Sequence, residues 1–298
     1  MEDKVIGIDL GGTHIKGILM SKEGEILQKL HRRTDDQEAS HGFTVWQERI
    51  KEMVEELSTE NAYAVGISAP GLPRADGKAI AFMPGRLQGL EDFDWSQFIN
   101  NPQTFVLNDA VAALLAERNF GAAQGYQHVM LLTLGTGVGG ALLINGKPYI
   151  GKLSRAGHLG HISLNPDAET GILDLPGTLE YFVGNATIEK RSMGKFSSTH
   201  QMVEAYASGD HYATQLWMDT LKKLAIGISS LINVISPELI ILGGGISQAE
   251  EALFEPLQKL MDIYEWRPGG VSTPIVAAQM KEFAGAIGAA VYALDNSL

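Results

Sequence analysis

The chain has 298 residues, of which 45% are hydrophobic and 19% charged, and it contains no cysteine. Its length predicts one large domain or two of medium size, and the missing cysteines exclude disulfides and thiolate metal ligands. A formal net charge of −12 argues against general binding to nucleic acid or an anionic membrane, because both need clustered Lys and Arg.

The N-terminal sequence MEDKVIGIDLGGT starts directly with a strand pattern, without the basic and apolar regions of a secretory signal. No run of about 18–20 uninterrupted apolar residues follows it. We therefore expect a soluble, cytoplasmic protein that binds neither membranes nor nucleic acid.

The first half of the chain alternates strand and helix patterns. KVIGIDL and HIKGILM predict two strands joined by a glycine turn, and the apolar spacing over residues 43–57 predicts a helix. AYAVGISAPG predicts a further strand. TFVLND predicts a short strand whose polar end opens the helix AVAALLAERNFG, which Gly121 closes.

The second half repeats this opening. HVMLLTLGTGVGGALLINGK again predicts strand, glycine turn and strand, which suggests an internal duplication. Residues 185–211 are polar and only partly helical in pattern, and residues 212–235 predict a long helix that ends before Pro237. ELIILGGGIS and STPIVAAQM predict strands, with a helix from about Gln248 between them and the helix FAGAIGAAVYAL at the end. The order predicts an α/β protein with two similar halves.

Three glycine turns have the composition of phosphate-binding loops: DLGGTHIK, LGTGVGG and LGGGIS. Glycine lets backbone N–H groups approach an anion closely, Thr13 and Thr136 can add hydroxyl donors, and Lys16 can add charge. Asp9 can hold Mg²⁺ through water. Each turn alone is also ordinary hairpin chemistry, and none matches the P-loop or GxGxxG patterns. The combination of the three turns with an acid and a lysine favours phosphate binding.

The chain resembles the ROK family of sugar kinases and sugar-responsive repressors, within the hexokinase/actin-like ATPase superfamily. The resemblance rests on motifs in the family's order: IGIDLGGTHIKGIL, GISAPG, LNDAVAALLAE, LTLGTGVGGALLINGK, GHLGHISL and PELIILGGGIS. It implies two actin-like (ribonuclease H-like) α/β domains with an active-site cleft between them. The expected domains are residues 1–108 plus 281–298, and residues 109–280.

The resemblance also implies roles for individual residues. The first phosphate loop would contain Asp9, Gly11, Gly12, Thr13 and Lys16. The second would contain Thr136 and Gly137, and the adenosine would lie by Gly243, Gly244 and Gly245. Gly71 and Asn108 would bind the sugar, and Asp109 would be the catalytic base that accepts the proton of the sugar hydroxyl. The alternative for Asn108 and Asp109 is a helix N-cap, and the two roles are compatible.

The stretch GHLGHISLNPDAETGILDLPGTLE departs from the family, which commonly carries a structural zinc on one His and three Cys in this region. His161 and Glu180 match the family pattern and would bind substrate, whereas His158 replaces a glutamate. The three cysteine positions are Gly171, Leu173 and Thr178. We therefore expect no zinc site, and a loop held by Pro and Gly turns with apolar contacts from Ile172, Leu173 and Leu175.

Two alternatives remain for this stretch. His158 and His161 can share a metal with Asp167, Glu169 or Asp174, or His158 can simply make local hydrogen bonds. A second departure from the family is Arg86 in AFMPGRLQGL, near the family's sugar-binding asparagine. Arg suits a carboxylate or phosphate, although it also serves in surface ion pairs. Arg86 and His158 together suggest an anionic or substituted sugar.

The resemblance predicts an enzyme that uses ATP and Mg²⁺ to phosphorylate a hexose or hexose derivative, at the 6-hydroxyl, with Asp109 as general base. It also implies a homodimer. The alternative within the family is a catalytically silent sugar-binding regulator without its own DNA-binding domain. An actin-like ATPase that does not act on sugars is a third possibility.

Overall fold

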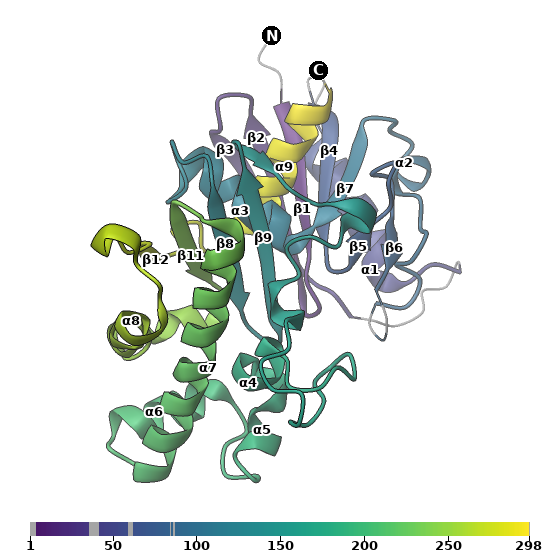
Figure 1. The fold of residues 1–298 in the computed structure, drawn as a ribbon. Coiled ribbons are helices and arrows are strands. Elements are labelled where there is room, and N and C mark those ends of the chain that lie inside the picture. The colour runs from purple at the N-terminus through teal and green to yellow at the C-terminus, as the bar shows by residue number, and fades with distance from the viewer. Residues whose placement is uncertain (1–3, 36–41, 59–61, 84, 86, 298) are drawn as a thin grey trace. The chain divides into compact units, whose positions relative to one another are not determined.

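The computed structural model describes residues 4–35, 42–58, 62–83, 85 and 87–297. The chain forms two compact units (Figure 1). Unit 1 comprises Met1–Gly125, Ile150–Ala156 and Gln279–Leu298, and unit 2 comprises Tyr126–Tyr149 and Gly157–Ala278. The domain boundaries expected after residues 108 and 280 stay a prediction.

Unit 1 is built on a five-stranded sheet in the order β3-β2-β1-β4-β7. The strands β1, β2 and β3 are antiparallel, while β4 and β7 continue the sheet in parallel from β1. The strands are β1 (Lys4–Leu10), β2 (His14–Ser21), β3 (Ile26–Arg33), β4 (Ala62–Ala69) and β7 (Thr104–Asn108). A small second sheet pairs β5 (Leu72–Pro73) with β6 (Ile80–Phe82). The hairpin and the two later strands confirm the sequence-based expectation.

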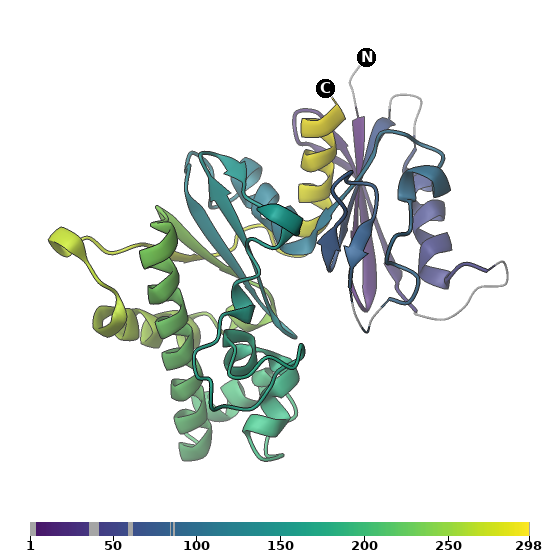
Figure 2. The same cartoon turned by 45° about the vertical axis from the view of Figure 1, so that its right-hand side comes forward.

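Helices cover both faces of this sheet. The alternate residues Ile6, Ile8 and Leu10 of β1 enter a core with Trp46 and Ile50 of α1. The opposite face packs against α9, which runs along the sheet in Figure 2. The helices of unit 1 are α1 (Val45–Leu57), α2 (Trp95–Phe98), α3 (Asp109–Phe120) and α9 (Ala284–Ser297), with a 3₁₀ turn η1 (Lys152–Ser154).

Contacts that only glycine permits bring α9 against the backbone of the sheet and of α3. A Cβ on Gly7 of β1 would lie 1.9 Å from the carbonyl oxygen of Ala286, and one on Gly66 of β4 would lie 1.9 Å from that of Ala289. On the helix side, a Cβ on Gly288 would lie 1.7 Å from the carbonyl oxygen of Ala112. Since real atoms do not approach this closely, the position of α9 depends on these glycines.

The segment that leads to α9 is tied to the end of α3 by a buried carboxylate. The two carboxylate oxygens of Glu117 accept the N–H groups of Ala122 and Met280, each at 2.7 Å. Glu117 is 1% exposed, so these bonds replace the water that a carboxylate would otherwise bind.

Unit 2 repeats the arrangement of unit 1. Its sheet has the order β10-β9-β8-β11-β12, again with three antiparallel strands followed by two parallel ones. The strands are β8 (Val129–Leu134), β9 (Val138–Ile144), β10 (Lys147–Pro148), β11 (Leu239–Gly243) and β12 (Ile275–Ala277). The same strand order in both units agrees with the duplication that the two hairpin patterns suggest.

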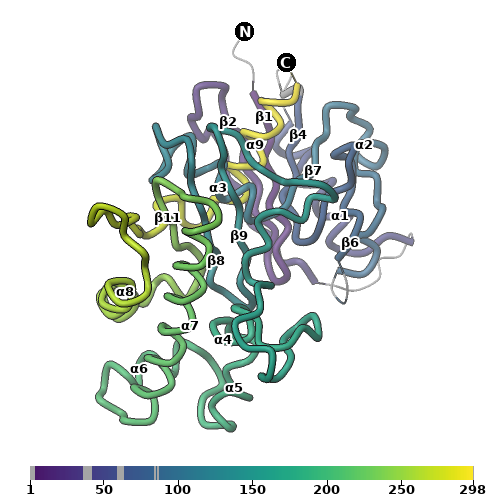
Figure 3. The backbone as a smooth tube through the Cα atoms, viewed as in Figure 1, coloured from purple at the N-terminus to yellow at the C-terminus, as the bar shows by residue number. Residues whose placement is uncertain are grey.

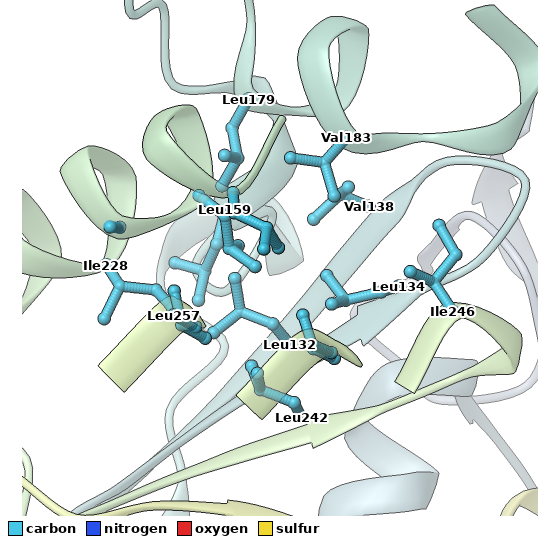
Figure 4. Close-up of a cluster of buried hydrophobic side chains, with 14 of the residues drawn as sticks. Leu132, Leu134, Val138, Leu159, Leu179, Val183, Ile228, Leu242, Ile246 and Leu257 are labelled. Atoms are coloured by element: carbon cyan, nitrogen blue, oxygen red, sulfur yellow. The ribbon is translucent and has the colours of Figure 1, made fainter. Parts of the chain in front are cut away.

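The core of unit 2 lies between this sheet and its helices. Leu132 and Leu242 of the sheet gather with Ile228 of α7 and Leu257 of α8 (Figure 4). Figure 3 follows the backbone from the long helix α7 through β11 to α8. The helices are α4 (Leu179–Val183), α5 (Ile188–Arg191), α6 (Thr199–Ala207), α7 (His211–Ile235) and α8 (Glu251–Tyr264). The 3₁₀ turns are η2 (Leu159–His161), η3 (Asn185–Thr187), η4 (Gly245–Ala249) and η5 (Pro268–Gly270).

The predicted long helix is confirmed as α7, and the polar stretch 185–211 contains two short helices and a 3₁₀ turn. Within the described residues, no helix combines the length and hydropathy needed to cross a membrane.

We expect Gly7→Ala to destabilise the protein by about 3 kcal/mol, because the new methyl group would overlap the Ala286 backbone, which cannot rotate away. The matched control is Gly17→Ala in the neighbouring strand, where the nearest atoms, at 2.9 to 3.1 Å, are flexible ends of Met53, Ile8 and Leu57. Its cost should be about 1 kcal/mol. Denaturant unfolding measures both, and equal losses of stability would contradict the assigned role of Gly7.

Candidate active site

Asp9 lies near the carboxyl end of β1, opposite Lys16 of β2 and Ser68 of β4. The Ser68 hydroxyl donates a 2.9 Å hydrogen bond to Asp9 Oδ1. Burial raises the pKa of the Asp9 carboxyl, while the Ser68 hydrogen bond and the charge of Lys16 lower it. The residue as a whole is partly exposed.

The turn after β1 is held by a residue beyond the hairpin. The Thr34 hydroxyl donates to the carbonyl of Gly11 at 2.6 Å, and the Thr34 N–H donates to that of Thr13 at 2.9 Å. A trans peptide points its C=O and N–H in opposite directions, so the Gly12 N–H points away from Thr34. Gly12 and Thr13 are exposed, which leaves this turn open to a ligand.

The start of α9 packs against this end of the sheet. A Cβ on Gly285 would lie 2.3 Å from Asp9 Cγ, so any larger residue at this position would displace the carboxylate. Lys16 Nζ donates to the carbonyl of Glu282 at 2.9 Å, and an ammonium group has two further N–H donors. Lys16 thus anchors the segment before α9 through one of its three N–H groups.

Asn108 ends β7 and caps α3. Its Oδ1 accepts the N–H groups of Ala110 and Val111 at 2.9 and 3.3 Å, and its Nδ2 donates to the carbonyl of Gly71 at 3.0 Å. The helix-cap alternative is therefore confirmed for Asn108. Both lone pairs of Oδ1 are used by these bonds, whereas the second N–H of Nδ2 is available to a sugar hydroxyl, so the cap does not exclude sugar binding. Gly71 has a φ of +102°, which favours glycine there.

Asp109 opens α3 with its side chain exposed to solvent, and its Oδ1 accepts the N–H of Ala110 at 2.8 Å. Although solvent reaches it, the surrounding protein displaces much of the water around the carboxyl and raises its pKa to about 6. The negative charge of Asp9 raises the pKa further, and the Ala110 hydrogen bond opposes the shift. A carboxylate with a pKa near 6 is ionised at neutral pH and is a stronger base than an ordinary aspartate.

The second glycine turn, between β8 and β9, packs against Glu180 of α4. Glu180 Oε2 accepts the N–H of Val138 at 3.0 Å, and the side chain is buried. A Cβ on Gly137 would lie 2.2 Å from the same oxygen. Thr136 at the tip of the turn is exposed.

His158 directly precedes the turn η2 and His161 ends it; their rings are nearly parallel, 5.8 Å apart between centroids and at an angle of 9°. Both residues are partly exposed. In the part of the chain that the structure describes, no group of three or more His, Asp and Glu side chains is arranged to hold a metal ion. The shared-metal alternative has no support there, and Glu169, one of its proposed ligands, instead pairs with Lys190.

The loop after η2 corrects one expectation. Ile172, Leu173 and Leu175 are 53%, 41% and 43% exposed, so the predicted apolar contacts do not hold the loop. Backbone bonds hold it instead: Gly177 donates to the Glu169 carbonyl at 3.0 Å and accepts from the Leu164 N–H at 2.7 Å. A tight turn brings its own backbone groups within hydrogen-bond reach, whereas its side chains point largely to solvent.

The third glycine turn follows β11. Gly244 has a φ of +87°, and a Cβ there would lie 2.4 Å from the carbonyl oxygen of Leu134. The Ser247 hydroxyl donates to the Gly244 carbonyl at 2.7 Å, and the turn opens the 3₁₀ turn η4, with α8 starting only at Glu251. Gly244 and Gly245 are exposed, while Gly243 is buried at the strand end. Arg86 lies outside the described residues.

The structure thus brings together Asp9, the first glycine turn, Lys16, Gly71, Asn108 and Asp109 in unit 1. In unit 2 it brings together the second glycine turn, Glu180 and the turn that carries His158 and His161.

Two supporting residues were missed from the sequence. Ser68 stands in the GISAPG motif at a strand end, which is a usable signal, but no motif marks Arg191. The Arg191 guanidinium bonds to Thr187, Thr220 and the Gly184 carbonyl, and burial lowers its pKa to about 10. It stays charged at neutral pH and holds the segment next to the second glycine turn.

Residues 5–296 match the ROK family. Glucokinase from Thermotoga maritima is 33% identical over 96% of both chains, and N-acetylgalactosamine kinase AgaK from Shewanella sp. is 29% identical over 83% of both. Among solved structures, a ROK hexokinase from Thermus thermophilus is 28% identical and superposes with a TM-score of 0.85 over 99% of both chains.

A ROK family glucokinase from Streptomyces griseus, in complex with glucose and AMPPNP, is 28% identical, with a TM-score of 0.79 over 98% of this chain and 100% of that one. These similarities extend over almost the whole chain and agree with the α/β architecture of both units. This chain therefore belongs to the ROK family and has its actin-like ATPase fold.

Proposed function

We propose that this protein is an ATP-dependent carbohydrate kinase that phosphorylates a hexose or hexose derivative. The observation that carries the proposal is Asp109, a solvent-accessible carboxylate at the start of α3 with its pKa raised to about 6 beside Asp9. The family and the kinases among its relatives support this reaction class. The protein would act in the cytoplasm, where ATP is present, and the family resemblance makes a homodimer its expected assembly.

In the proposed reaction, Asp109 orients the 6-hydroxyl of the sugar and accepts its proton as the oxygen attacks the γ-phosphorus of ATP. The bond from that phosphorus to the bridging oxygen breaks, and ADP leaves. The glycine turns with Thr13 and Thr136, together with Lys16, would bind the phosphates through N–H, hydroxyl and ammonium donors. Gly243, Gly244 and Gly245 would lie by the adenosine.

The residues present fit a magnesium ion. Asp9 and Asp109 carry negative charges close enough that Asp9 raises the pKa of Asp109, and a cation would relieve this repulsion. Asp9 would hold Mg²⁺ through water, and the ion would neutralise charge on the phosphates of bound ATP.

On the sugar side, we propose contacts from Gly71, Asn108, His158, His161 and Glu180, with Arg86 as an additional candidate. A neutral imidazole offers one donor and one acceptor, and an imidazolium only donors, whereas a carboxylate only accepts. His158 in place of the family's glutamate therefore favours a sugar that presents an acceptor there, such as an acyl or acidic substituent. We further propose that the enzyme works without structural zinc.

A coupled assay of ATP consumption over hexoses, N-acyl hexosamines and sugar acids tests the function directly. Stimulation of ATP consumption by at least one sugar is expected. A sugar that raises the unfolding temperature while no ATP is consumed would instead identify a silent regulator.

Asp109→Asn is expected to lower kcat by about 10²–10⁴-fold, because the amide cannot accept the hydroxyl proton but still accepts the Ala110 N–H. Sugar affinity should change little. Asp76→Asn is the matched control, since that exposed carboxylate pairs with Arg74 on the surface and should leave kcat unchanged. Wild-type turnover in Asp109→Asn would overturn the assignment of the base.

The pKa of Asp109 predicts two pH effects. The value of kcat/KM should fall as the pH drops through about 6, because protonated Asp109 cannot act as a base. Since the folded pKa exceeds the ordinary value of 3.8, the folded state loses stability as the pH rises through this interval. Asp109→Asn should therefore raise the free energy of unfolding at pH 8, by about 1 kcal/mol after allowance for solvent screening, and by less at pH 4.5.

Because we propose that the loop folds without zinc, we expect elemental analysis of the purified protein to find substoichiometric zinc. A zinc-selective chelator, added with Mg²⁺ in excess, should leave the unfolding temperature and kcat unchanged, because backbone bonds at Gly177 hold the loop. One zinc per chain would contradict the prediction.

A further inference from the structure

The second glycine turn of unit 2 has a backbone orientation set by its neighbours. The carbonyls of Gly135 and Thr136 accept the N–H groups of Asn185 and Ala186, each at 2.9 Å. Because C=O and N–H point in opposite directions in a trans peptide, the N–H groups of Thr136 and Gly137 point away from this segment. Within the described chain neither of these two N–H groups donates to a protein acceptor. Two adjacent N–H groups on one side of a turn suit an anion.

The next peptide, between Gly137 and Val138, has its N–H directed toward the protein, where Glu180 accepts it. Its Oε2 accepts the Val138 N–H at 3.0 Å, and the Gly137 carbonyl on the opposite side of that peptide accepts the Gly135 N–H at 3.0 Å. Glu180 is 8% exposed, and the 2.2 Å that would separate its Oε2 from a Cβ on Gly137 shows how closely it lies on the turn. The carboxylate thus fixes the orientation of the peptide that directly follows the N–H groups of Thr136 and Gly137.

Val138 also contacts the turn from His158 to His161, which we call the histidine turn. A Cβ on Gly160 of η2 would lie 2.0 Å from the carbonyl oxygen of Val138, so the backbone between His158 and His161 rests on that carbonyl. The N–H of Leu179, next to Glu180, donates to the Ile162 carbonyl at 2.9 Å. Val138 is therefore held on its N–H side by Glu180 and on its C=O side by the histidine turn.

We propose that Glu180 is a positioning residue for the phosphoryl donor: through the Val138 N–H it keeps the N–H groups of Thr136 and Gly137 oriented toward the phosphates of ATP. The carbonyl of Val138, against which Gly160 packs, links this turn to the histidine turn. This inference rests on the proposed function, and it gives Glu180 a role toward the nucleotide that is separate from contact with the sugar.

The test measures the binding of Mg²⁺–AMPPNP to the intact protein without sugar, by calorimetry. Glu180→Ala should weaken this binding at least tenfold, because the 137–138 peptide loses its acceptor. Glu180→Gln should restore binding to within about threefold of wild type, since the amide oxygen can accept the same N–H. Nucleotide affinity unchanged in Glu180→Ala would overturn the proposal. Absence of nucleotide binding in the wild type would overturn the proposed function instead.

A double-mutant cycle keeps the test independent of the folding of one variant. Gly137→Ala should weaken nucleotide binding by pushing the Glu180 carboxylate away, and this loss should shrink in the Glu180→Ala background, where the clash is absent. Gly135→Ala is the matched control, because its Cβ would meet nothing within 4 Å, and its effect should be equal in both backgrounds. Additive effects of Gly137→Ala and Glu180→Ala would contradict the proposal.

Discussion

The close approach of α9 to the backbone of unit 1 is the constraint on which the candidate active site depends. Gly7 and Gly66 let the helix touch the sheet, and Gly288 lets it touch α3. Asp9 lies at the end of one contacted strand, and Asp109 begins the contacted helix. Helix packing usually leaves 8–10 Å between axes to accommodate side chains, and backbone contact removes that tolerance. The relative position of the two carboxylates is therefore fixed by a helix that carries neither.

The carboxylic acids of unit 1 fall into two groups according to the direction in which the protein shifts their pKa. Asp76 and Asp35 have lowered pKa values, because Arg74 and Arg49 donate hydrogen bonds to them. Burial raises the pKa of Asp9, and the loss of surrounding water together with the charge of Asp9 raises the pKa of Asp109; in both cases these effects outweigh the hydrogen bonds. Two neighbouring carboxylates with raised pKa values cost stability when both are ionised, and such pairs are characteristic of functional sites.

Local pattern predicts most of the secondary structure, because apolar periodicity and glycine turns act over a few residues. The paired hairpins, α1, α3 and α7 all lie where the sequence places them. Contacts between residues far apart in the chain cannot be predicted from local pattern. Nothing near Glu180 indicates that its carboxylate contacts Val138, 42 residues earlier, and the LDL triplet at 173–175 gives no sign that its leucines stay exposed. The positions of the site residues within each unit could be anticipated only through motifs that recur across a family.

The position of α9 in the chain sets an order of events during synthesis. The strands of unit 1 emerge from the ribosome first, yet the helix that covers one face of their sheet follows all of unit 2. Until α9 is made, the face of the sheet that contains Gly7 and Gly66 lacks the helix that covers it in the folded protein. Unit 2 is contiguous apart from residues 150–156 and lies entirely before α9 in the chain, so unit 1 can be completed only after unit 2 has been synthesised. The part of the protein that carries Asp9 and Asp109 is thus begun first and finished last.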